Sequence, residues 1–220
     1  MYQMMWRCQV HVLRPMFAWD RDGALEFAAS RGFGAFIANG EGGPISSHVP
    51  FRIQRKPDVV TVQFHLTARN KLAELADGET PFLLIVWGPD AYVSNDWYAT
   101  PDHVSTWLYE AVHLSGPVRR LTAESNREHG DTLLATFEER LKPKQPWSLA
   151  TMEAEKRETM LQSIVVLEMD VQRVEGQRKL NQHKSDEDYA SITRHLSKSD
   201  SADAREIAGK LRELRPRLNY

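Results

Sequence analysis

The sequence of 220 residues has little cysteine and no long apolar run. Cys8 is its single cysteine, which excludes an internal disulfide framework and a cysteine-rich zinc site and is typical of a protein of the reducing cytoplasm. No stretch approaches the roughly 20 apolar residues of a membrane-spanning helix, and the first residues lack the apolar core and cleavage site of a secretory signal. We therefore expect a soluble, cytoplasmic protein with no membrane partner.

Several common catalytic motifs are also absent. The chain contains no G-x-G-x-x-G, no Walker loop, no G-x-S-x-G and no H-E-x-x-H, so the usual nucleotide-binding, hydrolase and zinc-protease classes lose their support. His103 and His113 stand ten residues apart without a cysteine or a clustered carboxylate nearby. We expect them to be structural histidines, and we predict no metal site.

The chain also lacks an excess of positive charge. The net charge of −2 gives no overall attraction for nucleic acid. From Arg173 onward, 11 basic residues stand against 8 acidic ones, whereas the first 172 residues carry 17 against 22. We expect this basic C-terminal part to be a solvated helical face, with contact to nucleic acid as the alternative, so any DNA binding is predicted to be weak or indirect.

Aromatic residues are concentrated in one stretch, Pro89–His113, which contains two of the six tryptophans and three of the six tyrosines. The apolar run Phe82–Trp87 before it predicts a strand buried on both faces, and Thr106–Val118 predicts a second strand, so the stretch is expected to connect two central strands. Such residues build a core or a subunit interface, or stack on a planar ligand, and the sequence leaves these alternatives open.

The remaining pattern predicts a mainly β protein with helices. Three strands with short connections follow the first helix, which indicates an antiparallel sheet. A closed barrel would hide the sheet edges. The predicted helices cover residues 20–31, 67–78 (with Thr67 as the N-cap), 123–141, 149–163 and two segments within 186–218. The first predicted strand begins after residue 31, and the other predicted strands cover 45–53, 59–66, 82–87, 106–118 and 164–176.

Two short motifs could bind a phosphate. His65–Lys71 places Arg69, Asn70 and Lys71 at the start of a predicted helix after a strand, where cations and backbone N–H groups favour an anion. A solvated first turn has the same pattern. On a neighbouring strand, the hydroxyls of Ser46 and Ser47 and the imidazole of His48 could hydrogen-bond the same ligand, or they could be ordinary edge polarity.

A third polar segment, Glu175–Asp188, follows the last predicted strand. Lys179, Asn181, Gln182 and His183 supply more donors than a turn needs. A solvated loop remains our expectation for this segment, with ligand binding as the alternative.

Five motifs, in this order and at this spacing, resemble the PaiB-like family of FMN-binding negative transcriptional regulators. The resemblance covers essentially the whole chain. The motifs are His65–Asn70, Gly88–Tyr98, Thr106–Gly116, Pro146–Trp147 and Glu175–Gln182.

The resemblance implies a split antiparallel β-barrel of the FMN-binding type and a homodimer with flavin sites at the subunit interface. It also implies repression of genes for sporulation and degradative enzymes. The alternative is a flavin- or haem-dependent oxidoreductase on the same fold, and a third hypothesis is a dimeric binding protein without a cofactor. We expect residues 1–184 to form the barrel domain and 185–220 a helical C-terminal extension. The candidate FMN-binding residues are Ser46, Ser47, His48, His65, Arg69, Asn70, Lys71, Trp107, Lys179 and Gln182.

Overall fold

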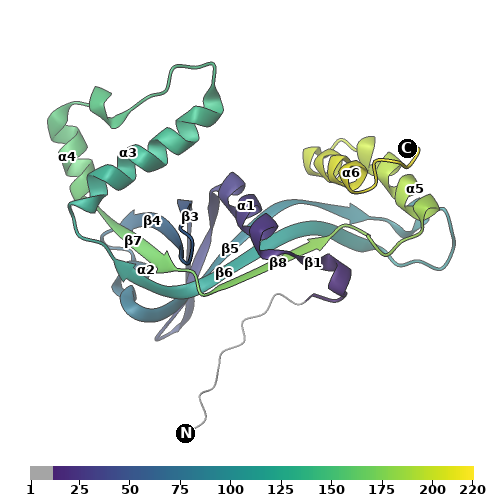
Figure 1. The fold of residues 1–220 in the computed structure, drawn as a ribbon, viewed down its shortest axis with the longest axis horizontal. Coiled ribbons are helices and arrows are strands. Elements are labelled where there is room, and N and C mark those ends of the chain that lie inside the picture. Colours follow the sequence, from purple (N-terminus) through teal and green to yellow (C-terminus); the bar gives the residue numbers. More distant parts are fainter. Residues whose placement is uncertain (1–11) are drawn as a thin grey trace, which may run out of the picture. The chain divides into compact units, whose positions relative to one another are not determined.

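A computed structural model describes residues 12–220 of the protein (Figure 1). Cys8, on which the predicted absence of a disulfide framework depends, lies outside the described residues. The chain divides into two units. Unit 1 comprises the residues up to Ala24, Trp87–Val112 and Glu175–Tyr220, and unit 2 comprises Leu25–Val86 and His113–Val174.

Six strands of one sheet form a closed ring in the order β5, β2, β3, β4, β7 and β6, because β6 pairs with both β5 and β7. The pairings of β2 with β3 and β5, of β4 with β3 and β7, and of β6 with β7 are antiparallel. This arrangement confirms the predicted antiparallel barrel, which hides its own edges. The strands are β2 (Phe33–Gly40), β3 (Gly43–Arg55), β4 (Val60–Thr67), β5 (Asp77–Val93), β6 (Thr106–Arg120) and β7 (Ile164–Asp170).

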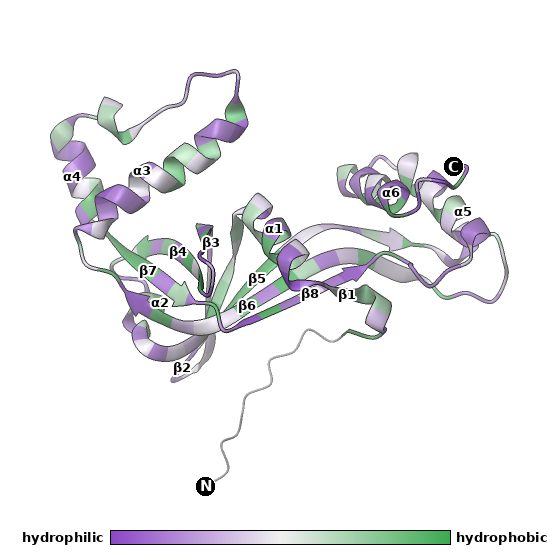
Figure 2. Cartoon of the chain, in the orientation of Figure 1, coloured by the Kyte–Doolittle hydropathy of each residue, from purple (hydrophilic) through white to green (hydrophobic). Residues whose placement is uncertain are grey.

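Side chains that alternate along the strands build the interior of the barrel in unit 2. In β4, Val60, Val62, Phe64 and Leu66 are buried, whereas the residues between them are partly exposed. Phe64 stacks on Phe36 of β2 with ring centroids 3.6 Å apart. Figure 2 shows apolar and polar residues alternating along the strands, as expected for a sheet with one buried face.

The prediction of a strand buried on both faces at Phe82–Trp87 was wrong. Strand β5 is longer than predicted, and within it Phe82, Leu84 and Val86 are buried while Leu83 and Ile85 are only partly buried. Trp87 is 43% exposed. The loop between β5 and β6 is also shorter than the predicted aromatic stretch, because β5 continues to Val93. Residues 94–105 form this loop, and they contain the single 3-10 turn η2 (Asn95–Trp97).

The helices of unit 2 follow the sequence prediction with two exceptions, the helix predicted at 67–78 and the single helix predicted at 149–163, which is a 3-10 turn and a separate helix. Helix α1 (Arg21–Arg31), which begins in unit 1, and helix α3 (Ser125–Glu138) with its extension η3 (Glu139–Leu141) agree with it. The helix predicted at 67–78 is only α2 (Lys71–Glu74). Its N-cap is Asn70 and not Thr67, because Thr67 is still paired with Ile164 in the sheet. The segment between α3 and β7 contains η4 (Leu149–Thr151) and α4 (Ala154–Gln162).

The long strand predicted at 164–176 is two strands, β7 and β8 (Arg173–Lys179). The chain turns at Val171 and Gln172, whose amides donate to Val60 O and Ser115 O at 2.9 Å each. These bonds tie the two residues to different strands, so the ladder of β7 ends there. Strand β8 lies in the sheet between β6 and β1 (Ala18–Trp19), which follows the turn η1 (Pro15–Phe17).

Gly116 lies where β6 passes the end of β7. A Cβ atom at this position would lie 1.8 Å from Asp170 O, a backbone atom that cannot move away cheaply. We expect Gly116→Ala to lower the free energy of unfolding by about 3 kcal/mol, measured by urea denaturation. Gly42→Ala is the control, because no atom lies within 4 Å of its Cβ position; equal stability of the two variants would contradict the close approach.

The C-terminal helices of unit 1 share a core with the ends of β5 and β6. Helices α5 (Asp186–Ser197) and α6 (Ala202–Leu214) are capped by Ser185 and Ser201, whose side chains accept from Asp188 N and Ala204 N. The core contains residues from both helices and from both strands: Ala91, Val93, Tyr98, Leu108, Leu180, Tyr189, Ile192, Leu196, Ala204, Ile207, Ala208 and Leu211.

Within residues 12–220, no helix is both long and apolar enough to cross a membrane.

Candidate functional site

The turn between β4 and α2 is held against β3 in unit 2 by Asn70. Its Nδ2 donates to Ser47 Oγ at 2.9 Å, and its Oδ1 accepts from Leu72 N at 2.9 Å. The structure therefore brings Ser47 and Asn70 together, two predicted site residues 23 positions apart. Because Asn70 already caps Leu72 and α2 has only four residues, an anion here would be bound by side chains and not by a helix dipole.

Arg69 and Lys71 flank Asn70, and both side chains are exposed. Within the described residues, neither side chain forms a hydrogen bond or an ion pair. Lys71 also lines a polar cavity of about 540 Å³ with the turn Gly40–Ile45 and with Glu74. Two cations that lack protein partners beside a fixed amide are suited to bind a phosphate.

The three predicted residues of β3 lie on opposite faces of the strand. Ser46 and His48 are exposed, and Ser47 between them is partly buried. Successive side chains of a strand point to opposite faces, so Ser46 and His48 do not share the face from which Ser47 contacts Asn70.

His65 is engaged away from these residues. Its Nδ1 lies 3.0 Å from Nε2 of His129 in α3. Burial lowers the pKa of His129 to about 4, with smaller contributions from His65 and Arg52, and burial also lowers the pKa of His65. Both imidazoles are therefore neutral at pH 7, which makes His65 a poor partner for a phosphate.

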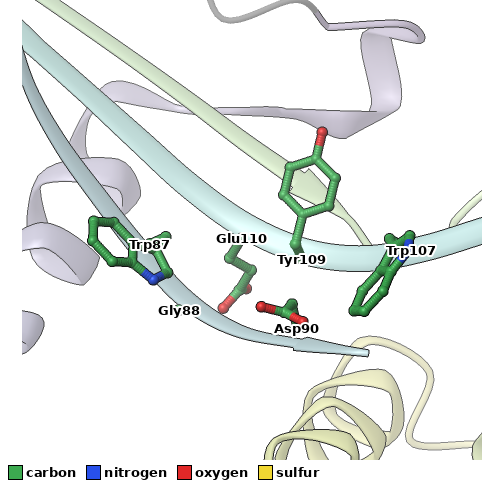
Figure 3. A pocket seen from close by; sticks show the side chains of 6 residues that line it. All are labelled: Trp87, Gly88, Asp90, Trp107, Tyr109 and Glu110. Atoms are coloured by element: carbon green, nitrogen blue, oxygen red, sulfur yellow. The ribbon is translucent and has the colours of Figure 1, made fainter. Parts of the chain in front are cut away.

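In unit 1, Trp107 lies at a shallow, open pocket of about 440 Å³ that is also lined by Trp87, Gly88, Asp90, Tyr109 and Glu110 (Figure 3). Trp107 is 53% exposed and Tyr92, whose ring it meets edge to face, is 49% exposed. Large aromatic side chains exposed to this degree on neighbouring strands are typical of an interface. In Figure 3 the phenol of Tyr109 points away from the carboxyl group of Glu110, as the alternation of a strand requires.

Glu110 is a feature that the sequence analysis missed. Its side chain is fully buried, its Oε1 accepts from Arg178 Nε at 2.7 Å, and Lys210 Nζ lies 2.9 Å from Oε2 as an ion pair without hydrogen-bond geometry. The guanidinium of Arg178 also lies over the ring of Trp19. The signal in the sequence was the period of two, which places Glu110 on the same face as the buried Leu108 and Val112.

Lys179 and Gln182 have structural partners in unit 1. Lys179 Nζ donates to Thr106 Oγ1 at 2.8 Å, and burial lowers its pKa. Gln182 accepts from Leu180 N at 2.9 Å and donates to Arg178 O at 2.6 Å. The expectation of a solvated loop was wrong at this point, because Leu180 and Asn181 are buried.

His103 is a structural histidine, as predicted. Its ring stacks on Tyr98, its Nε2 lies 2.8 Å from Thr100 Oγ1 and 3.1 Å from Asp188 Oδ2, and its Nδ1 lies 2.8 Å from Lys184 Nζ. Asp188 is buried, and despite this burial its pKa is lowered by hydrogen bonds from Thr100 and Ser185.

Comparison with known families gives a match over most of the chain. Residues 12–173 match the family model described as "Putative FMN-binding domain". Protease synthase and sporulation protein PAI 2 of Bacillus subtilis (strain 168) is 25% identical over 182 residues, which cover 83% of this chain and 86% of that protein.

Solved structures show the same fold at low sequence identity. The FAD and heme binding protein from Mycobacterium smegmatis superposes with a TM-score of 0.55 at 15% identity and covers 78% of each chain. The flavocytochrome Anf3 from Azotobacter vinelandii gives a TM-score of 0.54 at 19% identity, over 82% of this chain and 78% of that one. These likenesses confirm the predicted split-barrel fold.

Proposed function

Because the chain belongs to this FMN-binding domain family, we propose that unit 2 binds the phosphate of FMN with Arg69 and Lys71 and that the protein is a PaiB-like negative transcriptional regulator. FMN is the cofactor that the family description names, in agreement with the sequence prediction. The observation that carries the proposal is the hydrogen bond from Asn70 to Ser47, which fixes the turn between two side chains with free positive charge.

The other candidate residues contribute unequally to this proposal. Ser47 stays in it as the support of Asn70. Ser46 and His48 are exposed on the other face of β3 from the contact of Ser47 with Asn70, so we assign no phosphate contact to them. His65, Trp107, Lys179 and Gln182 have the separate environments described above, so we assign no phosphate contact to them.

The regulatory role is supported by the relative in Bacillus subtilis, whose name associates that protein with protease synthesis and sporulation. We propose a corresponding role in gene regulation for this chain, in the cytoplasm, where a protein with one cysteine encounters reducing conditions. The flavin-binding structural neighbours are compatible with an oxidoreductase on the same fold, because one fold hosts many chemistries.

The visible absorption spectrum of the purified protein tests the cofactor. Bound flavin supports the proposal, bound haem favours the oxidoreductase, and the absence of both after incubation with FMN would refute it. Loss of negative regulation in a deletion strain, restored by the wild-type gene and not by a variant that cannot bind FMN, would link the cofactor to transcription.

We expect the protein to be a homodimer. Trp87, Tyr92 and Trp107 are all more than 40% exposed in unit 1, and an exposed aromatic surface of this kind is usually covered by a partner. Sedimentation at micromolar concentration should show twice the single-chain mass of 25.2 kDa. Trp107→Glu should shift the sedimenting species toward the monomer, whereas Val59→Glu, at an exposed apolar residue of unit 2, should not; a wild-type monomer would contradict the prediction.

We also expect the isolated protein to bind duplex DNA weakly. Most cations of residues 185–220 have partners in unit 1: Lys210 pairs with Glu110, Arg215 pairs with Asp186, Arg212 donates to Ser197 Oγ, and Arg205 donates to Ser199 O. Few DNA phosphates can then be neutralised. Each neutralised phosphate makes log K fall by about 0.9 per decade of salt, so fluorescence titrations should show binding that depends only weakly on salt concentration. A nanomolar, sequence-specific footprint at physiological salt would restore direct repression.

A further inference from the structure

A second cavity of unit 2 lies on the outer side of the barrel, beneath helices α3 and α4. Its volume is about 330 Å³, at the lower end of the range of small-molecule sites. Eleven residues line it, among them Pro50, His65, Leu134, Phe137, Trp147 and Met160, and none of the eleven carries a formal charge at neutral pH. The lining is therefore almost entirely apolar, with one imidazole.

Six segments of the chain form the walls of this cavity, the last of them the start of β7 at Ile164. Pro50 and His65 come from β3 and β4, α3 and α4 supply leucines and Met160, and Trp147 and Leu149 come from the segment between the two helices. At Gly130 the segments approach so closely that a Cβ atom would lie 3.0 Å from Leu149 Cδ1. A space bounded in this way fits a small molecule better than the flat side of a partner protein.

The imidazole of His65 gives the cavity a polar point. Its Nδ1 is occupied by His129 Nε2, while its Nε2 has no partner among the described residues. His129 is 2% exposed, and its Nδ1 has no hydrogen-bond partner there either. A buried N–H without a partner costs more than a bare acceptor nitrogen usually does, so the favoured tautomer has His129 Nε2–H donating to His65 Nδ1. His65 Nε2–H then remains as a donor for a ligand.

We propose that this cavity binds a small, uncharged, mainly apolar compound with one hydroxyl or carbonyl oxygen that accepts a hydrogen bond from Nε2 of His65. The lining contains no cation, so neither the phosphate of FMN nor a carboxylate would be compensated there. The inference is independent of the proposed FMN site and extends the protein's function to a second ligand.

Three probes of nearly equal shape test this assignment: 1-naphthol, naphthalene and 1-naphthoate. Binding is measured by NMR, as the change in chemical shift of the Met160 methyl group in full-length protein labelled with 13C-methyl methionine and saturated with FMN. The Met160 signal is assigned from its absence in Met160→Leu. We expect saturable shifts with 1-naphthol, about 5- to 10-fold weaker binding of naphthalene because the hydrogen bond is lost, and still weaker binding of 1-naphthoate because its charge is buried without a partner.

Two variants locate the site. Leu134→Trp fills the cavity and should weaken the binding of 1-naphthol by at least about 10-fold. Leu141→Trp, at an exposed leucine outside the lining, should have no effect on this binding. His65→Leu should abolish the preference for 1-naphthol over naphthalene while naphthalene still binds, which a merely structural role of His65 would not produce.

Five results would overturn the proposal. Four are the absence of any Met160 shift with the three probes, equal binding of all three, equal effects of Leu134→Trp and Leu141→Trp, and a Met160 shift that follows protein concentration, which would show a second copy over the cavity. A Met160 shift produced by FMN itself and abolished by Leu134→Trp would assign the cavity to the flavin and also overturn it.

Discussion

Replacing Arg69 and Lys71 together by alanine is expected to weaken the binding of FMN by about two or more orders of magnitude and to leave the binding of riboflavin almost unaffected. The two flavins differ in the phosphate, and charge-assisted contacts to a phosphate are the strong ones in such a site. Both side chains lack protein partners within the described residues, so their loss removes ligand contacts and leaves the fold intact. Fluorescence titration of each flavin with the variant measures the effect.

A control with the same loss of charge is Arg31→Ala with Lys56→Ala, two exposed cations of unit 2 that lie outside this turn. The control should bind FMN like the wild type. Equal weakening of both flavins by the Arg69 and Lys71 variant, or unchanged FMN binding, would remove these residues from the phosphate site.

Replacing Arg178 and Lys210 together by methionine is expected to lower the free energy of unfolding by about 3–5 kcal/mol. The carboxylate of Glu110 is fully buried between these two cations, and the double variant leaves it there without compensation. Methionine keeps most of the apolar length of both side chains, so the loss reports charge more than packing. Urea denaturation followed by tryptophan fluorescence gives the value.

Adding Glu110→Leu to this variant provides the matching test. An apolar triad replaces a buried ionic one with little change in volume, and such exchanges are often neutral or stabilising. The triple variant should therefore recover most of the stability lost by the double variant. If it is no more stable than the double variant, the loss arises from packing around Arg178 and Trp19 and not from the buried charge.

Patterns local in sequence predicted much of the fold. Alternation of apolar residues identified β3 and β6, the β-branched residues of Val59–Leu66 identified β4, and the two helices of the C-terminal part were found with the linker between them. The errors arose where contacts distant in sequence decide the outcome. Thr67 could serve as a helix cap, but its pairing with Ile164 keeps it in a strand. The break between β7 and β8 depends on Val60 and Ser115, which no local pattern around residue 171 reveals.

The candidate site was predictable only in part, for the same reason. Arg69, Asn70 and Lys71 are adjacent, so their grouping was visible, and the contact of Asn70 with Ser47 follows from neighbouring strands. The pairing of His65 with His129 joins positions 64 apart through helix α3, and the sequence gives no sign of it. Glu110 was visible as a charge on the apolar face that Leu108 and Val112 share.

The division into two units has a consequence for how the gene can be cut. The chain passes between the units at four places, and each falls inside a regular element: α1, β5, β6 and β8. No uninterrupted reading frame therefore encodes either unit alone, and a nick at any crossing would sever a helix or a strand instead of a linker. Fragments for separate study must be obtained by rejoining noncontiguous pieces, and genetic exchange between relatives should tolerate breakpoints in residues 94–105 or 142–153 better than at the crossings.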